Sequence, residues 1–528
     1  MPELIDIKKY YRFCMGMRKY LRHTISLNES RQIIKRQFKK REELFLRIVE
    51  KGVYGNPKSP YLKLLNSAGW EFGDIKSSTK SIGIEHTLEK LVRDGVYVNF
   101  EEFKGRKKAV RNEVALDFRE SDFDNPFLSR HFDVESGGSG GLGTRTMIDF
   151  DFLSYEAAHR ALVLDTYGLM DSPSIIWFPI LPGSAGTTNI LRQVKIGRPC
   201  LKWFSQVDKR SIRPPIKDRF GTGFIVFSGG LFGRKIPNPK HVDLKDAHKI
   251  AIYISSIMKD RSKCCVWSYV SSAIRICIAA KDKNLDFTGV TFFVSGEPLT
   301  KTKSEEIKSS GAVAVPYFAF AEGGIIAHGC ANPGETDDMH ILRDRVAVIS
   351  HKIRPRYFHK TVDALLFTSL IPESPKILLN VETGDHGLID SRECGCRFEG
   401  YGFSDHISSI RSFEKATSEG MTLMVSDLIR IVEDVLPAKH GGGSTDYQAL
   451  EEYDGAGLSF INIAVSPRVG PVDDADLKQT IIQALGKGGG SKRLMARILS
   501  DAEAIKIKRM DPIPTMRGKL LPFRNLNG

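Results

Sequence analysis

A glycine-rich segment has the composition of a phosphate-binding loop. It reads SGGSGGLGT over 136–144. Glycines let backbone N–H groups approach a phosphate without a Cβ in the way, and Ser136, Ser139 and Thr144 add hydroxyl donors. The spacing departs from the G-x-x-x-x-G-K-[ST] pattern of P-loops, so on composition alone a flexible linker is the alternative. The segment GSAGTT over 183–188 competes with it as an anion-binding loop.

Two acidic residues follow short apolar runs that we expect to be strands. Glu322 lies in FAFAEGG over 318–324, and Asp385 lies in VETGDHG over 381–387. A carboxylate such as Glu322 at a strand end can bind Mg²⁺ together with phosphate oxygens. Asp385 suits the two hydroxyls of a ribose, because a carboxylate accepts hydrogen bonds through both oxygens. For each motif taken alone, a turn or capping acid is the alternative.

The C-terminal tail presents a lysine in a pattern that is not typical of a packed core. The sequence TMRGK over 515–519 stands between Pro514 and Pro522. We interpret it as a mobile loop that presents Lys519 from outside the main fold. Gly-Lys pairs are common in surface turns, so a solvated lysine is the alternative.

Taken in their order along the chain, these four motifs resemble those of the adenylate-forming enzymes: acyl-CoA ligases, peptide synthetase adenylation domains and luciferases. The resemblance implies that the chain binds ATP with Mg²⁺ and activates a small carboxylic acid. It implies that Glu322 is a catalytic residue that holds Mg²⁺ and that Asp385 binds the ribose. The phosphate-binding residues that it implies are Ser136, Gly137, Ser139, Gly140 and Thr144.

The resemblance gives two further basic residues a role. Lys519 would reach over the active site and place its ammonium on the carboxylate oxygen and the α-phosphate, where negative charge develops during adenylation. Arg411 resembles the arginine of the family's hinge motif and is expected beside the cofactor, although Ile410 replaces the usual glycine.

Three positions depart from the family pattern. Gly138 stands where the loop usually has a hydroxyl residue, and Ala319 and Ala321 replace the glycine and the threonine that precede the glutamate. These departures keep a second class of function open, in which a decayed adenylation fold serves as a non-catalytic binding or scaffold protein.

A cysteine pair suggests a branch of the family. Arg-Glu-Cys-Gly-Cys at 392–396 resembles the phenylacetate-CoA ligases and the acyl-protein synthetases of bacterial luminescence. Because some members of that branch carry structural zinc, the resemblance implies a closed Cys₃His tetrahedron. Its ligands would be Cys330, His340, Cys394 and Cys396. Unligated cysteines are the alternative, since nine residues between Cys330 and His340 is unusual for a compact zinc knuckle.

The acyl acceptor is expected to be CoA, which would give a thioester. An amine, which would give an amide, or a carrier protein is the alternative. The acyl-protein synthetases pass the acyl group to a cysteine in the C-terminal domain. No cysteine follows Cys396 here, so self-acylation on cysteine is disfavoured.

The composition is that of a large globular protein. The chain has 528 residues, 41% of them apolar, and eight cysteines, too few for a disulfide framework, so a reducing, cytoplasmic setting is expected. No run of 18 apolar residues and no signal peptide is present, so no transmembrane segment is expected. A homodimer stays open.

The net charge of +14 is concentrated near the N-terminus, where residues 1–41 hold twelve Lys or Arg and three acids. A basic arm can attract nucleic acid or anionic lipid. No zinc-finger or RNA-recognition signature accompanies it, so a solvated helical face is favoured and nucleic acid is not an expected partner.

The order of apolar runs predicts an α/β fold with two domains. A large multi-layer N-terminal adenylation domain over 1–410 would begin with the basic helical segment. A small, mobile α+β C-terminal domain would cover 411–528. Strands are expected at 174–180, 223–227, 288–294, 312–318, 376–381, 458–465 and 504–508, and helices at 247–258 and 474–485.

Overall fold

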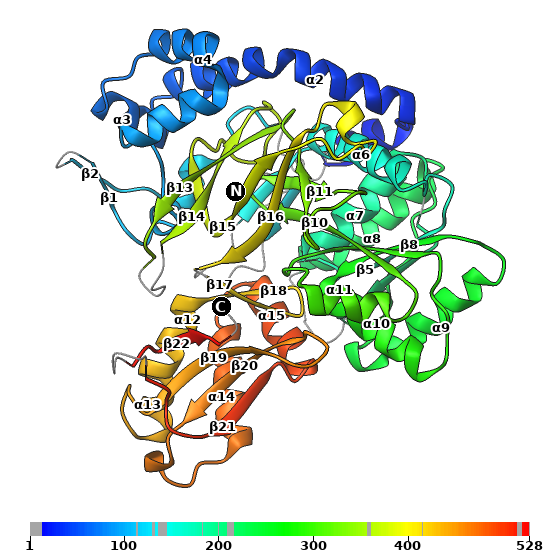
Figure 1. Ribbon diagram of the computed structural model, residues 1–528, viewed down its shortest axis with the longest axis vertical. Coiled ribbons are helices and arrows are strands. Elements are labelled where there is room, and N and C mark those ends of the chain that lie inside the picture. The colour runs from blue at the N-terminus through cyan, green and yellow to red at the C-terminus, as the bar shows by residue number, and fades with distance from the viewer. Residues whose placement is uncertain are drawn as a thin grey trace.

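The computed structural model describes most of the chain as a large α/β unit and a smaller α+β unit below it (Figure 1), which confirms the predicted fold class. The described residues are 13–111, 114–128, 132–135, 145–181, 183–198, 200–207, 216–355, 361–413, 415–514 and 520–526.

Helices of the large unit include α2 (Leu27–Ile48), α3 (Pro60–Ser67), α4 (Phe72–Arg93), α5 (Phe100–Phe103), α6 (Phe150–Thr166), α7 (Ser184–Lys195), α8 (Ile216–Leu231), α9 (Ala247–Met258), α10 (Val270–Asp282) and α11 (Lys301–Lys308). A π-helical turn, η1 (Val49–Tyr54), follows α2, and η2 (Glu120–Phe123) is a 3₁₀ turn.

A twelve-stranded sheet forms the centre of the large unit, in the order β13-β14-β15-β16-β12-β11-β10-β9-β8-β5-β6-β7. In chain order the strands are β5 (Ser174–Trp177), β6 (Lys202–Ser205), β7 (Lys240–His241), β8 (Cys264–Tyr269), β9 (Val290–Ser295), β10 (Val313–Phe320), β11 (Gly324–Gly329), β12 (Met339–Ile341), β13 (Val346–Ile353), β14 (Val362–Ser369), β15 (Val381–Ser391) and β16 (Asp405–Ser412). Two-stranded ladders pair β1 (Ala109–Arg111) with β2 (Val114–Leu116) and β3 (Phe132–Glu135) with β4 (Arg145–Ile148).

The half of the sheet from β10 to β7 is parallel. Its strands are short apolar runs, and all six residues of β8, CCVWSY, are buried. A strand of this kind lies between two covered faces, because the helices that connect parallel strands pack on both sides of a sheet. Helices α6, α7, α9 and α10 contribute to this core.

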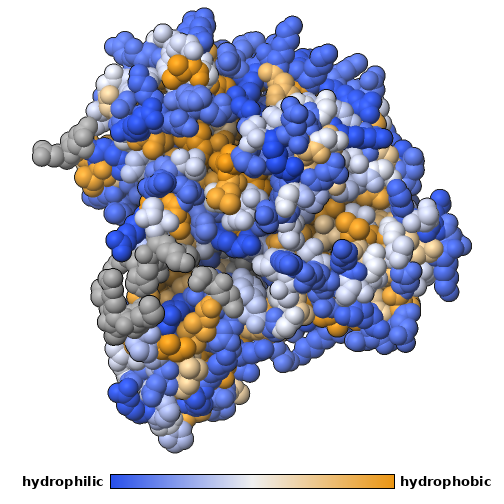
Figure 2. Space-filling model, viewed as in Figure 1, coloured by the Kyte–Doolittle hydropathy of each residue, from blue (hydrophilic) through white to orange (hydrophobic). Residues whose placement is uncertain are grey.

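The half from β13 to β10 is antiparallel, and the N-terminal helices cover it (Figure 1). Phe45, Leu64 and Leu88 from α2, α3 and α4 share a hydrophobic cluster with Leu366 and Leu378. Hydrophilic residues dominate the top edge of the surface where α2 lies (Figure 2). The lysines and arginines of α2 are mostly exposed, which fits the solvated helical face.

The smaller unit has a four-stranded sheet in the order β21-β20-β19-β22. Its strands are β19 (Tyr447–Tyr453), β20 (Ser459–Val465), β21 (Ile505–Arg509) and β22 (Phe523–Asn525), and its helices are α12 (Val425–Arg430), α13 (Leu436–His440), α14 (Asp474–Gly486) and α15 (Gly490–Asp501). The hairpin of β17 (Lys415–Ser418) and β18 (Met421–Met424) joins it to the large unit. Arg411 lies inside β16, and the division of domains at that residue stays a prediction.

Two expected strands are wrong. The run 223–227 lies within helix α8, because a short apolar run fits a buried helix as well as a strand. The run 376–381 is mostly irregular: Lys376 makes an isolated bridge with Asp124, and β15 begins at Val381. The expected helices at 247–258 and 474–485 agree with α9 and α14.

All eight cysteines are free thiols. None of the helices in the described ranges is long and apolar enough to cross a membrane.

A buried carboxylate fixes the turn between β10 and β11. Glu156 on α6 pairs with Arg192 at 2.6 Å and with Arg345 at 3.4 Å, and accepts a hydrogen bond from the backbone N–H of Ile325 at 2.9 Å. Gly324 has φ +72, and a Cβ there would lie 2.4 Å from Glu156 Oε1, so the turn requires glycine. The two arginines hold the pKa of Glu156 below its usual range although burial alone would raise it.

Replacing Glu156 by Gln should lower the free energy of unfolding by about 3–5 kcal/mol, because two buried guanidinium groups would lose their counter-charge. Chemical denaturation measures this change. Asp246→Asn, which removes an exposed pair with Lys249, is the matched control and should leave the midpoint unchanged. An equal effect of both substitutions would contradict this role of Glu156.

Candidate active site

A cavity of about 340 Å³ lies between the two units, where the ends of β9, β10, β15 and β16 meet the hairpin β17–β18 and the small sheet. Three of the residues predicted from sequence line it together: Glu322, Asp385 and Arg411. Phe318 and Phe320 of β10 form an aromatic part of the cavity wall. The remaining predicted residues, Ser136, Gly137, Ser139, Gly140, Thr144 and Lys519, lie outside the described residues.

Glu322 follows β10 and carries a partly buried ion pair. Lys104 Nζ lies 2.8 Å from Glu322 Oε1 and 3.3 Å from Glu120 Oε1. Burial alone would raise the pKa of Glu322, but the ammonium of Lys104 outweighs it and lowers the pKa to about 2. Burial disfavours the charge on Lys104, and the two carboxylates nevertheless raise its pKa. Glu322 is therefore a carboxylate at neutral pH.

Asp385 lies on β15 directly after Gly384, whose φ is +80. Its Oδ2 accepts a hydrogen bond from Thr383 Oγ1 at 2.8 Å and lies 3.3 Å from Lys415 Nζ. The side chain lines the cavity although the residue is only 8% exposed. A carboxylate held in this way can accept hydrogen bonds from a diol that enters the cavity.

Arg411 lies on β16 beside the cavity, half-exposed. Its Nη1 is 2.9 Å from Asp337 Oδ2 and donates to the carbonyl of Ile410 at 2.7 Å. Asp337 also accepts from the backbone N–H of Ser409 at 3.0 Å, and Ser409 has φ +53. The arginine is thus held at a distorted part of the strand and lines the cavity.

The turn of the hairpin β17–β18 packs against the large unit. Glu419 accepts two hydrogen bonds from Arg275 at 2.7 and 3.2 Å, and the backbone N–H of Gly420 donates to Glu297 Oε1 at 2.5 Å. A Cβ at Gly420 would lie 2.1 Å from the ring of Tyr269, so no other residue fits. Glu297 also binds Lys303 and Ser271, so it ties this turn to the large unit.

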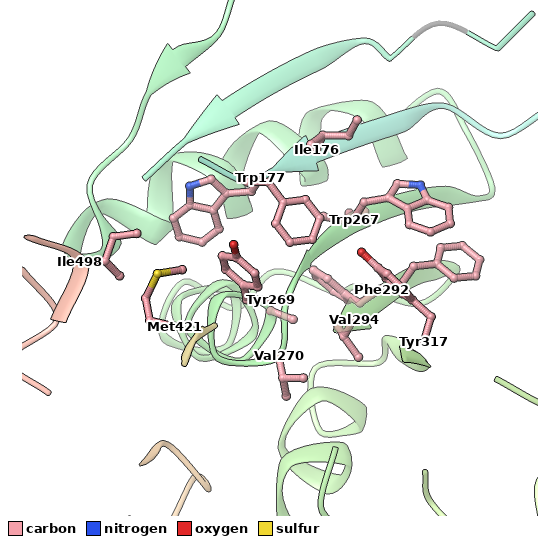
Figure 3. Packing of buried hydrophobic residues seen from close by; sticks show 14 of the residues in the cluster. Ile176, Trp177, Trp267, Tyr269, Val270, Phe292, Val294, Tyr317, Met421 and Ile498 are labelled. Carbon is pink, nitrogen blue, oxygen red and sulfur yellow. The ribbon is translucent and has the colours of Figure 1, made fainter. Parts of the chain in front are cut away.

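Apolar side chains continue this contact. Met421 and Ile498 from the C-terminal side lie beside Trp177 and Tyr269 (Figure 3). Trp177 is fully buried and Tyr269 packs edge-on against Phe178, with ring centroids 4.7 Å apart. Together with the Arg275–Glu419 pair, this packing fixes how the hairpin meets the large unit.

Five metal-ligand side chains converge at a second place, beside β12. The ligand atoms of Cys330, His340, Cys394 and His406 all lie within 4.8 Å of one another. Cys396 Sγ lies 3.1 Å from His340 Nε2. The four residues predicted as zinc ligands are therefore close together, and His406 is a fifth donor that the sequence interpretation missed.

Both histidines of this cluster are oriented by a contact at Nδ1. Nδ1 of His340 contacts the carbonyl of Phe403 at 2.8 Å, and Nδ1 of His406 contacts Asp338 Oδ1 at 2.6 Å. Nε2 of His406 is buried without a hydrogen-bond partner among the described residues. An imidazole with its back nitrogen held by a carboxylate or carbonyl and its other nitrogen turned inward has the arrangement of a metal ligand.

Gln448 on β19 of the small sheet binds the backbone of the C-terminal tail. The side-chain amide of Gln448 donates to the carbonyls of Ile513 at 3.1 Å and Leu521 at 2.7 Å and accepts from the N–H of Ile513 at 2.7 Å. His440 Nε2 contacts Thr480 Oγ1 at 3.1 Å. Gln448 therefore fixes the backbone on both sides of 515–519.

No family model matches the sequence, and no curated protein matches it either. A 2-hydroxyisobutyryl-CoA ligase in complex with 2-HIB-AMP and CoA, in the thioesterification state, is similar in structure. The TM-score is 0.57 at 12% sequence identity, covering 96% of this chain and 91% of that one. This likeness shows that the chain has the two-domain fold of that ligase.

Two further solved structures are similar at lower scores. An open conformation of the same ligase gives a TM-score of 0.41 at 12% identity, covering 90% of this chain and 92% of that one. A mutant of the amide bond synthetase Mcba from Marinactinospora thermotolerans gives 0.41 at 11% identity, covering 88% and 92%.

Replacing Arg275 by Ala should loosen the turn of the hairpin, because Glu419 would stay buried without its counter-charge. Backbone hydrogen exchange over 415–424 should accelerate roughly tenfold or more. Arg497→Ala, which removes the pair with Asp501 on α15, is the matched control and should leave exchange in the hairpin unchanged. Unaltered exchange in Arg275→Ala would show that apolar packing alone holds the turn.

Proposed function

We propose that this protein is an ATP-dependent, AMP-forming ligase that activates a small carboxylic acid as an acyl-adenylate. The observation that carries the proposal is that Glu322, Asp385 and Arg411 meet in one cavity between the two units. The fold shared with a CoA ligase supports it. Each of the three residues has the chemistry that the family resemblance assigns to its position.

In the first half-reaction a carboxylate oxygen of the acid attacks the α-phosphorus of ATP. The new bond joins the acyl group to AMP, and the bond to pyrophosphate breaks. Asp385 accepts hydrogen bonds from the ribose hydroxyls and so fixes the nucleotide in the cavity. Arg411 places positive charge beside the nucleotide. The loop residues Ser136, Gly137, Ser139, Gly140 and Thr144 bind the phosphates through backbone N–H and hydroxyl groups.

Glu322 is suited to bind magnesium, because it is ionised and lies on the wall of the same cavity. When bound, Mg²⁺ would neutralise charge on the phosphate oxygens. Lys519 supplies further positive charge to the carboxylate oxygen and the α-phosphate, where negative charge develops.

In the second half-reaction a nucleophile attacks the acyl carbon, and AMP leaves. We propose CoA as this acceptor, whose thiolate sulfur forms the thioester, with an amine or a carrier protein as the alternative. Rotation of the unit 411–528 about Arg411 would exchange the face that meets the cavity, bringing Lys519 in for adenylation and removing it afterwards. A reducing, cytoplasmic setting would suit this chemistry.

The acid-dependent exchange of labelled pyrophosphate into ATP tests this function. We expect exchange with one class among aryl, fatty and amino acids. Lys519→Ala should reduce it by roughly a hundredfold or more, because transition-state charge loses its donor. Lys487→Ala, an exposed lysine of the same unit, is the matched control. Asp385→Ala should weaken ATP binding in equilibrium dialysis.

Folded protein that exchanges no pyrophosphate with any acid and binds no ATP would refute the ligase proposal. It would favour the alternative of a non-catalytic scaffold on a decayed adenylation fold. ATP binding together with turnover that depends on Lys519 would exclude the scaffold.

We also propose that the second cluster binds a structural zinc through Cys330, His340, Cys394 and Cys396, with His406 as a fifth donor at hand. The convergence of three thiols with His340 supports this. The buried Nε2 of His406 has no hydrogen-bond partner among the described residues, so it is available as a further ligand. Zinc takes four nitrogen and sulfur ligands in structural sites, and these residues supply more than that number. The site lies on the antiparallel half of the sheet, where it would tie the loop 392–404 to β12.

Protein isolated without chelator should contain about one equivalent of zinc per chain by mass spectrometry. The double substitution Cys394→Ser and Cys396→Ser should abolish it, whereas Cys14→Ser, which changes a thiol remote from the cluster, should retain it. His406→Gln separates the two ligand sets: retention of zinc assigns the tetrahedron to Cys₃His, and loss makes His406 a ligand. Zinc-free wild-type protein after refolding with excess zinc would refute the site.

A further inference from the structure

A lysine from the N-terminal segment lies beside the carboxylate that the proposed function gives to magnesium. Lys104 follows the short helix α5, whose start is fixed by a reciprocal cap between Asn99 and Glu102. Its ammonium contacts Glu322 at 2.8 Å and Glu120 at 3.3 Å. The three side chains are 12–21% exposed, and Lys104 and Glu322 line the cavity.

The segment that carries Lys104 and Glu120 is held by strand β15 and by the residues before that strand. The backbone N–H of Val98 donates to the carbonyl of Asn380 at 3.0 Å, and Glu382 N–H donates to Val98 at 2.9 Å. Lys376 Nζ donates to the carbonyl of Glu120 at 3.0 Å. The segment that carries Lys104 and Glu120 is thus anchored to the strand that carries Asp385, which fixes the ammonium relative to the nucleotide site.

Lys104 is shared by the carboxylates of Glu120 and Glu322, so the group carries more negative than positive charge. Glu322, Lys104 and Glu120 together carry a net charge of −1. A divalent cation prefers carboxylate and phosphate oxygens, and Glu322 Oε1 already faces an ammonium. If a cation takes Glu322, Lys104 keeps Glu120 as a partner, so the ammonium and this carboxylate stay paired in their partly buried positions.

We propose that Lys104 is a positioning residue that competes with divalent metal for Glu322 and passes to Glu120 when metal arrives with the triphosphate. This inference rests on the proposed function, because it gives Glu322 the metal. It adds that Glu322 alone binds metal weakly and that phosphate oxygens are needed to displace the ammonium. The substrate then brings its metal to a carboxylate that is already oriented.

Manganese binding to the nucleotide-free protein, measured by electron paramagnetic resonance, tests the competition directly. Lys104→Gln removes the competitor and should tighten Mn²⁺ binding roughly tenfold or more, since Glu322 and Glu120 then lose the ammonium that lies between them. Adding Glu322→Gln should abolish this gain. Glu120→Gln should weaken binding instead, because the lysine then has Glu322 as its remaining partner in the group.

Lys415→Gln is the matched control, because it removes another lysine from the same cavity that pairs with Asp385 rather than Glu322. Its Mn²⁺ affinity should change much less than that of Lys104→Gln. Equal affinities in these two variants would overturn the proposal, and so would a change in the same direction for Lys104→Gln and Glu120→Gln. If Lys104→Gln does not fold, the weaker binding expected of Glu120→Gln still decides, and unaltered binding there overturns the proposal.

ATP binding by the same preparations separates this inference from the proposed function. Opposite Mn²⁺ shifts without ATP binding would refute the ligase and leave the lysine–metal competition standing. ATP binding with unaltered Mn²⁺ affinity in every variant would refute the competition alone.

Discussion

The buried Glu156 carboxylate is the interaction on which the arrangement of the site depends. It joins α6, α7 and the residue before β13 through Arg192 and Arg345, at the point where the sheet passes from parallel to antiparallel pairing. The same carboxylate receives the N–H of Ile325, and Arg345 donates to the carbonyl of Gly323 at 3.0 Å. Glu322, one residue earlier, therefore stands on a clamped turn, and its direction into the cavity is set from the core.

Both units contribute to the cavity wall, so the shape of the cavity depends on how the units meet. β15 and β16 supply Asp385 and Arg411, while Glu451 and Tyr453 come from β19 of the smaller unit. The turn at Gly420 approaches Tyr269 so closely that a single methyl group there would clash with the ring. Contacts of this kind have few intermediate positions, because close-packed side chains allow discrete arrangements more readily than gradual ones.

Short motifs singled out three residues of the cavity because they encode local chemistry. Glu322, Asp385 and Arg411 were each recognisable from the residues beside them, and the structure brings them into one cavity. Lys104 and Glu120 carried no such signal, because Lys104 meets Glu322 across 218 residues of sequence. The segment that carries both is bridged to residues near 380, which no local pattern reveals. His406 was missed for the same reason: it becomes a donor only because β16 pairs with β12.

Local sequence patterns are also ambiguous, and this explains the two wrong strand predictions. The apolar run 223–227 gives the same composition whether it lies in a strand or, as found, in α8. Segments whose type follows from period and caps, such as α9 and α14, agreed closely. Gln448 shows the complementary case, in which a polar residue is buried to hold backbone from a distant part of the chain.

The contacts of residues 98–124 with residues 376–382 have a consequence for the order in which the chain folds during its synthesis. Asp124 pairs with Lys376, 252 residues later, and the apolar faces of α3 and α4 pack against strands from that same late stretch. At ribosomal speeds this interval takes on the order of ten to fifty seconds. During that time the first helices emerge without the surface that covers them. Lys104 therefore enters the cavity only after the strand carrying Asp385 has left the ribosome.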